Sequence, residues 1–119
     1  MHEELEQKLV QRWPTWFDIQ GFEHGDGWFG ILWRLFSDLQ PLVDEMEGEG
    51  SQPFVVVRVR EERGGLHVYV NDGTDAIFER IQAAQQESFF TCEVCGQPGW
   101  RRQDGWVRTR CDEHADPEQ

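Results

Sequence analysis

Four potential metal ligands, grouped into two short pairs, lie close together near the end of this sequence. Cys92 and Cys95 form a C-x-x-C pair, and Cys111 and His114 form a C-x-x-H pair after fifteen intervening residues. This separation lies within the range for two pairs that bind a single Zn²⁺ ion, which accepts tetrahedral coordination by thiolate and imidazole. Residues 92–114 are therefore predicted to form a zinc ribbon with these four residues as ligands.

The predicted zinc ion, one per chain, is structural. Four protein ligands complete a tetrahedral site, whereas a catalytic zinc ion usually keeps one position for water. A domain of about this size buries only about two-thirds of the surface that its unfolded chain exposes, so metal binding would add folding energy. The alternative is three buried thiols beside an unrelated histidine. We disfavour it because all four residues fit one spacing pattern.

Residues 1–91 have the hydrophobic periodicity of an acidic α+β core. Apolar residues recur at helical spacing over about 3–12, 27–46 and 75–87. Asp26 is the predicted N-cap of the second helix, and Asp72 or Thr74 that of the third. Pro41 is expected to kink or divide the second helix.

Residues 54–71 alternate between apolar and polar side chains, as the strands of a β-hairpin do. The predicted buried residues are Val55, Val57, Val59, Leu66, Val68 and Val70, and the partly exposed ones are Arg58, Arg60, His67 and Tyr69. The sequence thus predicts an α+β fold, in which helices pack on a small antiparallel β-sheet and a zinc-ribbon-like hairpin, integrated with the core, follows. Residues 115–119 are expected to form a flexible acidic tail.

The charge of the chain is strongly acidic and unevenly distributed. Eleven basic residues stand against 23 acidic ones, for a net charge of −12, and the segment 92–114 is the only part without net negative charge. The densest acidic groups are Asp44, Glu45, Glu47, Glu49, Glu61 and Glu62. They are candidate contacts to a protein partner, for example a basic nucleic-acid-binding complex whose groove would accept carboxylates in place of phosphates. Ordinary solubility explains the same charge without a partner.

The predicted ribbon also has the residue composition of a surface that binds nucleic acid. Its arginines and tryptophans are Trp100, Arg101, Arg102, Trp106, Arg108 and Arg110, and Asp104-Gly105 between them is a strong hairpin turn. A zinc-ribbon nucleic-acid-binding protein is therefore an alternative. Because phosphate would approach against the field of the acidic core, we favour arginines that dock the ribbon onto that core.

The glycine-rich segment 21–28 raises the further alternative of a small enzyme. His24 and Asp26 could act as an acid/base pair, with His67 converging on the same cleft. A tight turn followed by an N-cap explains the same residues without chemistry, so we expect no enzymatic activity.

Three stretches together resemble small proteins of unassigned activity encoded by phages and prophages. These are GFEHGDGW at 21–28, VREERGGLHVYV at 59–70, and CEVCGQPGW followed by GWVRTRCDEH within 92–114. That group often has a cysteine where this chain has His24. The resemblance implies a protein made in a host cell during infection or from a prophage. It makes an inhibitor of host nucleic-acid machinery, such as an anti-CRISPR or other anti-defence protein, one expected function.

The expected location is the cytoplasm. No apolar run in the sequence approaches the length of a membrane span, and residues 1–10 lack the basic start and apolar stretch of a signal peptide. No membrane contact is expected, and the sequence predicts no particular oligomeric state.

Overall fold

The computed structural model describes residues 1–19, 21–103 and 105–115. Its elements in chain order are α1 (Glu3–Arg12), β1 (Phe22–Glu23), the 3₁₀ turn η1 (Asp26–Trp28), α2 (Phe29–Gly48), β2 (Val56–Glu62), β3 (Gly65–Val70), α3 (Asp75–Ser88), β4 (Trp100–Arg102), β5 (Arg108–Arg110) and the 3₁₀ turn η2 (Asp112–His114). These elements confirm the predicted α+β fold. Of the expected acidic tail, residues 116–119 lie outside the described residues.

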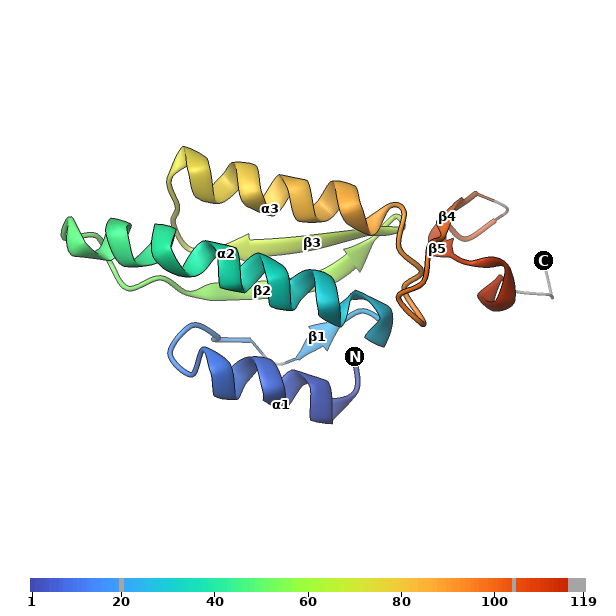
Figure 1. Cartoon of the computed structure of the whole chain (residues 1–119), viewed down its shortest axis with the longest axis horizontal. Helices are drawn as coiled ribbons and strands as arrows, with labels where there is room; N and C mark the ends of the chain where they lie inside the picture. The colour runs from blue at the N-terminus through green and yellow to red at the C-terminus, as the bar shows by residue number, and fades with distance from the viewer. Residues whose placement is uncertain (20, 104, 116–119) are drawn as a thin grey trace.

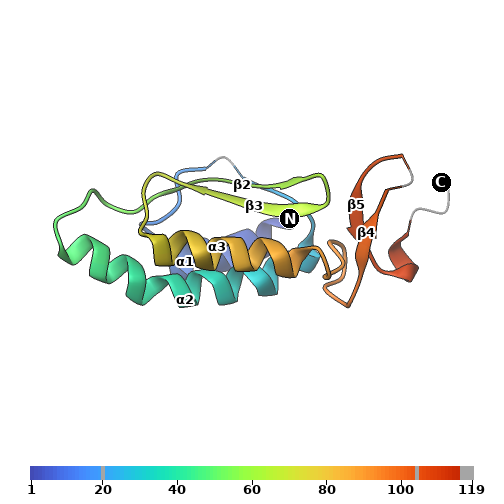
Figure 2. The same cartoon turned by 90° about the horizontal axis from the view of Figure 1, so that it is seen from above.

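The helices cover one side of a three-stranded sheet, and the β4–β5 hairpin lies beyond the end of that sheet (Figures 1 and 2). The strand order is β1-β2-β3, with β2 and β3 antiparallel and β1 parallel to β2. The sequence predicts the antiparallel pair but not β1, because two residues are too few to show an alternating pattern. The mixed sheet thereby ties the glycine-rich segment to the core.

The core forms where the apolar stripe of α2 meets the sheet and the residues around Pro14. Leu32, Leu35 and Phe36 of α2 have no exposed surface. Trp13 and Trp16, which follow no clear periodicity in the sequence, are 2% and 5% exposed and stack with ring centroids 5.8 Å apart. These tryptophans therefore contribute to the core rather than to a partner surface.

Pro41 does not divide α2, which runs continuously for 20 residues through it. The residue is exposed, so water can satisfy the carbonyl group that a proline nitrogen leaves without a donor. None of the described helices has both the length and the hydropathy that are needed to cross a bilayer.

The cap prediction for Asp26 is wrong, whereas that for Thr74 is confirmed. Asp26 lies in η1, and α2 has no side-chain cap. Its carboxylate instead accepts the His2 backbone N–H at 2.6 Å, where a negative charge interacts favourably with the start of α1. Thr74 accepts the Ile77 N–H at 3.3 Å and caps α3 as expected.

A β-bulge in β2 overturns the predicted burial of its valines. Val56 pairs with Val70, but Arg58 pairs with Tyr69, so Val57 is an extra residue on β2. The extra residue reverses which side chains of the strand face the core at this point. Val56 is fully buried in place of Val55 and Val57, and Val57 is 44% exposed, whereas Val59 is buried as predicted.

We expect substitutions at these neighbouring valines to differ sharply. Val56→Ala should lower the free energy of unfolding by about 2 kcal/mol, because it leaves a cavity at a buried position. Val57→Ala should change it by less than about 0.5 kcal/mol. Urea unfolding of the metal-loaded protein measures both values, and equal losses would contradict the bulged register.

Candidate metal centre

The fold brings the four predicted ligands together. One ligand atom from each of Cys92, Cys95, Cys111 and His114 lies within 4.8 Å of every other, so the cluster could hold a metal ion. The Cys111 Sγ is 3.2 Å from the His114 Nδ1, and the Cys95 and Cys111 sulfurs are 3.7 Å apart. All three cysteines are free thiols. Three sulfurs and one imidazole nitrogen form a donor set suited to zinc.

Local backbone turns place each pair of ligands. The Gly96 N–H donates to the Cys92 carbonyl at 2.9 Å, and Gly96 has a φ of +81°, which favours glycine. The second pair is closed by a hydrogen bond of 3.2 Å from the His114 N–H to the Cys111 carbonyl. Cys92 is fully buried and Cys95 is exposed, so the cluster lies at the boundary between core and solvent.

Backbone N–H groups favour the thiolate of the buried ligand. Burial alone would raise the pKa of Cys92, but N–H groups of Cys111, Cys95 and Val94 outweigh it and lower the pKa to about 6. At Cys95 the Gln97 N–H acts to lower the pKa, while desolvation and contacts with the Cys92 and Cys111 sulfurs raise it overall. These N–H groups therefore favour the thiolate form of Cys92, which is the form that a metal ion would bind.

The first ligand pair packs directly against the glycine-rich loop of the core. The Gly27 N–H donates to the Glu93 carbonyl at 2.7 Å, and the Gly25 N–H donates to the Glu93 carboxylate at 3.0 Å. A Cβ atom on Gly27 would lie 2.1 Å from the Cys92 carbonyl oxygen, and one on Gly25 would lie 2.4 Å from that of Glu93. Only glycine permits this approach. The sequence predicts a tight turn in this glycine-rich segment but does not identify the backbone that packs against it.

Two further contacts fasten the segment that carries the four potential ligands to the core. The Trp28 indole donates to the Thr91 carbonyl at 2.9 Å, and the buried Thr109 hydroxyl donates to the Gly64 carbonyl at 2.5 Å. Glu93 is also partly buried, and burial raises its pKa although the Gly25 N–H opposes this. Neither Glu93 nor Thr109 stands out in the sequence as a functional residue, because each acts through a contact distant in the chain.

A methyl group at Gly27 should disrupt this interface. We expect Gly27→Ala to lower the free energy of unfolding by about 3 kcal/mol or more, because two backbone segments must separate. Gly48→Ala is the matched control, since a Cβ there meets no atom within 4 Å. It should leave stability unchanged or slightly increased. Denaturant unfolding of both metal-loaded variants tests the contact, and a tolerated Gly27→Ala would contradict it.

Arg101 docks the ribbon onto the core through contacts that include no carboxylate of the described residues. Its Nη2 donates to the Arg63 carbonyl at 2.9 Å, and its guanidinium lies over the Phe89 ring at 4.6 Å. Docking by an arginine is as expected, but its contacts are a carbonyl group and an aromatic ring rather than carboxylates.

Two other ribbon arginines support the second ligand pair. Arg102 binds the Asp112 carboxylate at 3.0 Å and the Arg110 carbonyl at 3.2 Å, and it lies over the Trp100 ring. Arg110 donates to the His114 carbonyl at 3.4 Å. These donors point into the ribbon, which weakens the case for a phosphate-binding surface.

The remaining ribbon residues lie around the hairpin turn. Arg108 is opposite Arg102 in the β4–β5 register, and Trp106 is 74% exposed beside Gly105. Gly105 has the positive φ of a tight turn, whereas Asp104 lies outside the described residues.

The candidate acidic residues form two separate groups rather than one surface. Asp44, Glu45, Glu47 and Glu49 lie at the C-terminal end of α2, whereas Glu61 and Glu62 end β2 at the opposite end of the sheet (Figure 1). Among them, Glu47 accepts the Phe54 N–H, Glu61 accepts the Gly64 N–H, and Glu62 accepts the Tyr69 hydroxyl. Asp44, Glu45 and Glu49 are exposed. They are the acids most available to a partner.

The three residues of the catalytic hypothesis, His24, Asp26 and His67, take part in different contacts. The His24 Nδ1 lies 2.7 Å from the Gly25 carbonyl, whereas Asp26 binds His2. His67 lies on the sheet, 3.9 Å from the Glu62 carboxylate. His24 is only 7% exposed, and burial lowers its pKa from 6.5 to about 4, against the opposing effect of the Gly25 carbonyl. It is therefore a buried, neutral imidazole near pH 7.

This pKa makes stability depend on pH. Because the unfolded chain binds the His24 proton near pH 6.5 and the folded chain near pH 4, stability falls as the pH drops through this window. The wild type should lose about 2 kcal/mol more than His24→Phe between about pH 7 and pH 5, because phenylalanine cannot be protonated. Every other side chain is common to both proteins, so the difference isolates His24. Parallel pH curves would show that His24 titrates normally.

Comparison of the chain with protein families, with curated proteins and with solved structures found no match.

Proposed function

We propose that this chain is a non-enzymatic binding protein whose fold is stabilised by one structural zinc ion. The Cys₃His cluster supports zinc, because four protein donors leave no position for a catalytic water. Contacts of the first ligand pair with Gly25 and Gly27 support a structural role, because a metal ion there would hold the C-terminal segment against the core.

The proposed partner is a protein with a basic surface. The observation that carries this proposal is a difference between basic and acidic side chains. Among the described residues, most arginines bind groups within the chain, whereas several exposed acids do not. Ion pairs involve Arg34, Arg58, Arg60, Arg80 and Arg102. Asp44, Glu45 and Glu49 are exposed at the end of α2 and have no basic partner among the described residues. Such a patch favours a partner of opposite charge.

The proposed setting is infection of a bacterial cell by a phage, or expression from a prophage. There, an acidic protein of this kind would occupy the basic nucleic-acid groove of a host defence complex, such as a CRISPR effector or a restriction enzyme. The resemblance to phage-encoded proteins and the acidic patch on α2 support this proposal. In this setting the protein acts in the host cytoplasm.

Charge reversal at the end of α2 tests the partner chemistry. The triple variant Asp44→Lys, Glu45→Lys and Glu49→Lys should fold, because lysines at a helix C-terminus are favourable. Affinity capture from host lysate by the wild type should recover a basic nucleic-acid-binding complex. The triple variant should recover it about tenfold less well.

The control applies the same charge change elsewhere. Glu4→Lys, Asp72→Lys and Glu79→Lys reverse three other exposed acids. This control should retain capture, because only the net charge differs and the α2 patch is intact. If both variants lost capture equally, the effect would come from net charge rather than from the α2 patch. Full capture by the α2 variant would contradict a role for that patch.

A further inference from the structure

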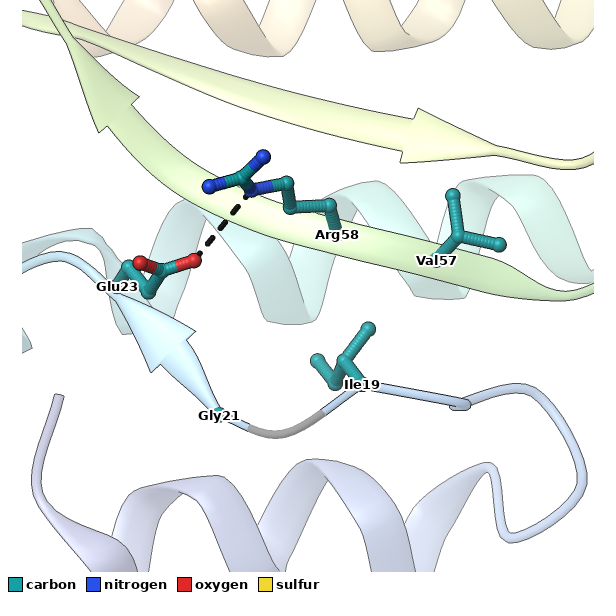
Figure 3. A pocket seen from close by; sticks show the side chains of 5 residues that line it. All are labelled: Ile19, Gly21, Glu23, Val57 and Arg58. Carbon is teal, nitrogen blue, oxygen red and sulfur yellow. Dashed lines mark ion pairs between the residues drawn. The ribbon is translucent and has the colours of Figure 1, made fainter.

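A groove of about 480 Å³ opens beside the bulge of β2, lined by Ile19, Gly21, Glu23, Val57 and Arg58 (Figure 3). It lies between β2 and the segment that leads into β1. In Figure 3, the Glu23 and Arg58 side chains reach toward each other, and Ile19 points toward β2. The groove is distinct from the metal centre and from the acidic end of α2.

Interrupted strand pairing creates this opening. The segment before β1 pairs with β2 in parallel at Phe17 and Val56, and again at Phe22 and Val59. Four positions therefore separate the two contacts on the side of β1, and only two separate them on β2. No strand pairing joins the described residues between the two contacts. The bulge adds to this effect because it turns Val57 outward, to 44% exposure. Bulges are over-represented where a strand must redirect a side chain at a functional site.

The groove combines an apolar side with an exposed carboxylate. Ile19 and Val57 provide the apolar surface. The Glu23 carboxylate lies 3.5 Å from the Arg58 Nε, with side chains 58% and 51% exposed. An ion pair this exposed is weak, because water screens both charges. A basic side chain from a partner can therefore share Glu23 with Arg58.

The charge around the groove is acidic. A second hollow of about 310 Å³ shares Ile19 and Gly21 and continues along α1, where Glu3, Glu6 and Val10 line it. Val10 is 40% exposed, so the apolar surface continues into this hollow. Among the described residues, three acids (Glu3, Glu6 and Glu23) and one base (Arg58) line the two hollows, so these residues carry a net negative charge. Their electrostatic complement is a basic ligand with apolar side chains.

We propose that this groove binds a short basic segment of a partner protein. An aliphatic side chain of that segment packs on Ile19 and Val57, and a lysine or arginine binds Glu23. The inference rests on the proposed role as an acidic binding protein and adds the site of apolar contact. Charged surfaces chiefly set the rate and specificity of association, whereas a buried apolar contact adds affinity.

A titration with defined peptides tests the groove. Metal-loaded, ¹⁵N-labelled protein is titrated with the capped pentapeptide Lys-Leu-Lys-Val-Lys and followed by amide chemical shifts. Glu-Leu-Glu-Val-Glu and Lys-Ser-Lys-Ser-Lys are the comparison peptides, which reverse the charge or remove the apolar side chains. The first peptide should shift amides of residues 17–19, 21–23 and 56–60. The acidic peptide should shift none, and the serine peptide should bind roughly fivefold to tenfold more weakly.

Two variants change the groove in opposite ways. Val57→Ser removes exposed apolar surface, and Gly21→Leu adds a side chain where a Cβ meets no atom within 4 Å. Each should weaken binding of Lys-Leu-Lys-Val-Lys at least about fivefold. Phe78→Ser is the control, because Phe78 is a similarly exposed hydrophobic residue on α3, at 49%. It should leave the affinity unchanged.

The outcomes separate this inference from the proposed function. Shifts that map to Asp44–Glu49, or affinities unaffected by both groove variants, would overturn the groove but leave the acidic patch as the contact surface. Equal binding of the serine peptide would also overturn it. Self-association, detected as a concentration-dependent change without peptide and absent in Val57→Ser, would assign the groove to a second copy and overturn the proposed occupant. Conversely, groove binding that survives reversal of Asp44, Glu45 and Glu49 would support the groove, and the capture experiment then tests the α2 patch separately.

Discussion

The close packing of the glycine-rich loop against the first ligand pair is the contact on which the rest of the structure depends. Gly25 and Gly27 approach the backbone of Cys92 and Glu93 so closely that no side chain fits between them. The loop continues through η1 into α2, the central helix of the core, and the other side of the contact carries two of the four potential metal ligands. A metal ion bound to the cluster would therefore stabilise the core as well as the ribbon.

This arrangement places the contacts of the ligand cluster apart from the surfaces that we propose for recognition. The buried contacts of Trp28, Thr91 and Thr109 join the metal centre to the core, and the ribbon arginines are largely directed to carbonyl groups within the chain. The surfaces that we propose for a partner are the exposed acids at the end of α2 and the groove beside Val57. The acids lie at the end of α2, and Val57 and Arg58 of the groove lie on β2.

Features set by local spacing could be predicted from the sequence, whereas those set by distant contacts could not. The metal cluster and the three helices follow from residue spacing and hydrophobic periodicity, and Thr74 caps α3 through a contact three residues away. Alternation alone places Val57 in the core, because a bulge depends on pairing with β3 rather than on β2 itself. Asp26 has the position of a helix cap, but its partner is His2, which the fold brings from the chain start. The pairing of Gly27 with Glu93 is equally distant in the chain.

Hydrogen exchange before and after metal removal tests the central claim most directly. The metal-loaded protein should contain about one zinc ion per chain by elemental analysis. Addition of a strong chelator should then expose the Gly27 and Gly96 amides and the Trp28 indole N–H to exchange together, because the loop and the ligand pair form one interface. A protein purified without metal that protects these three groups equally well would contradict the account.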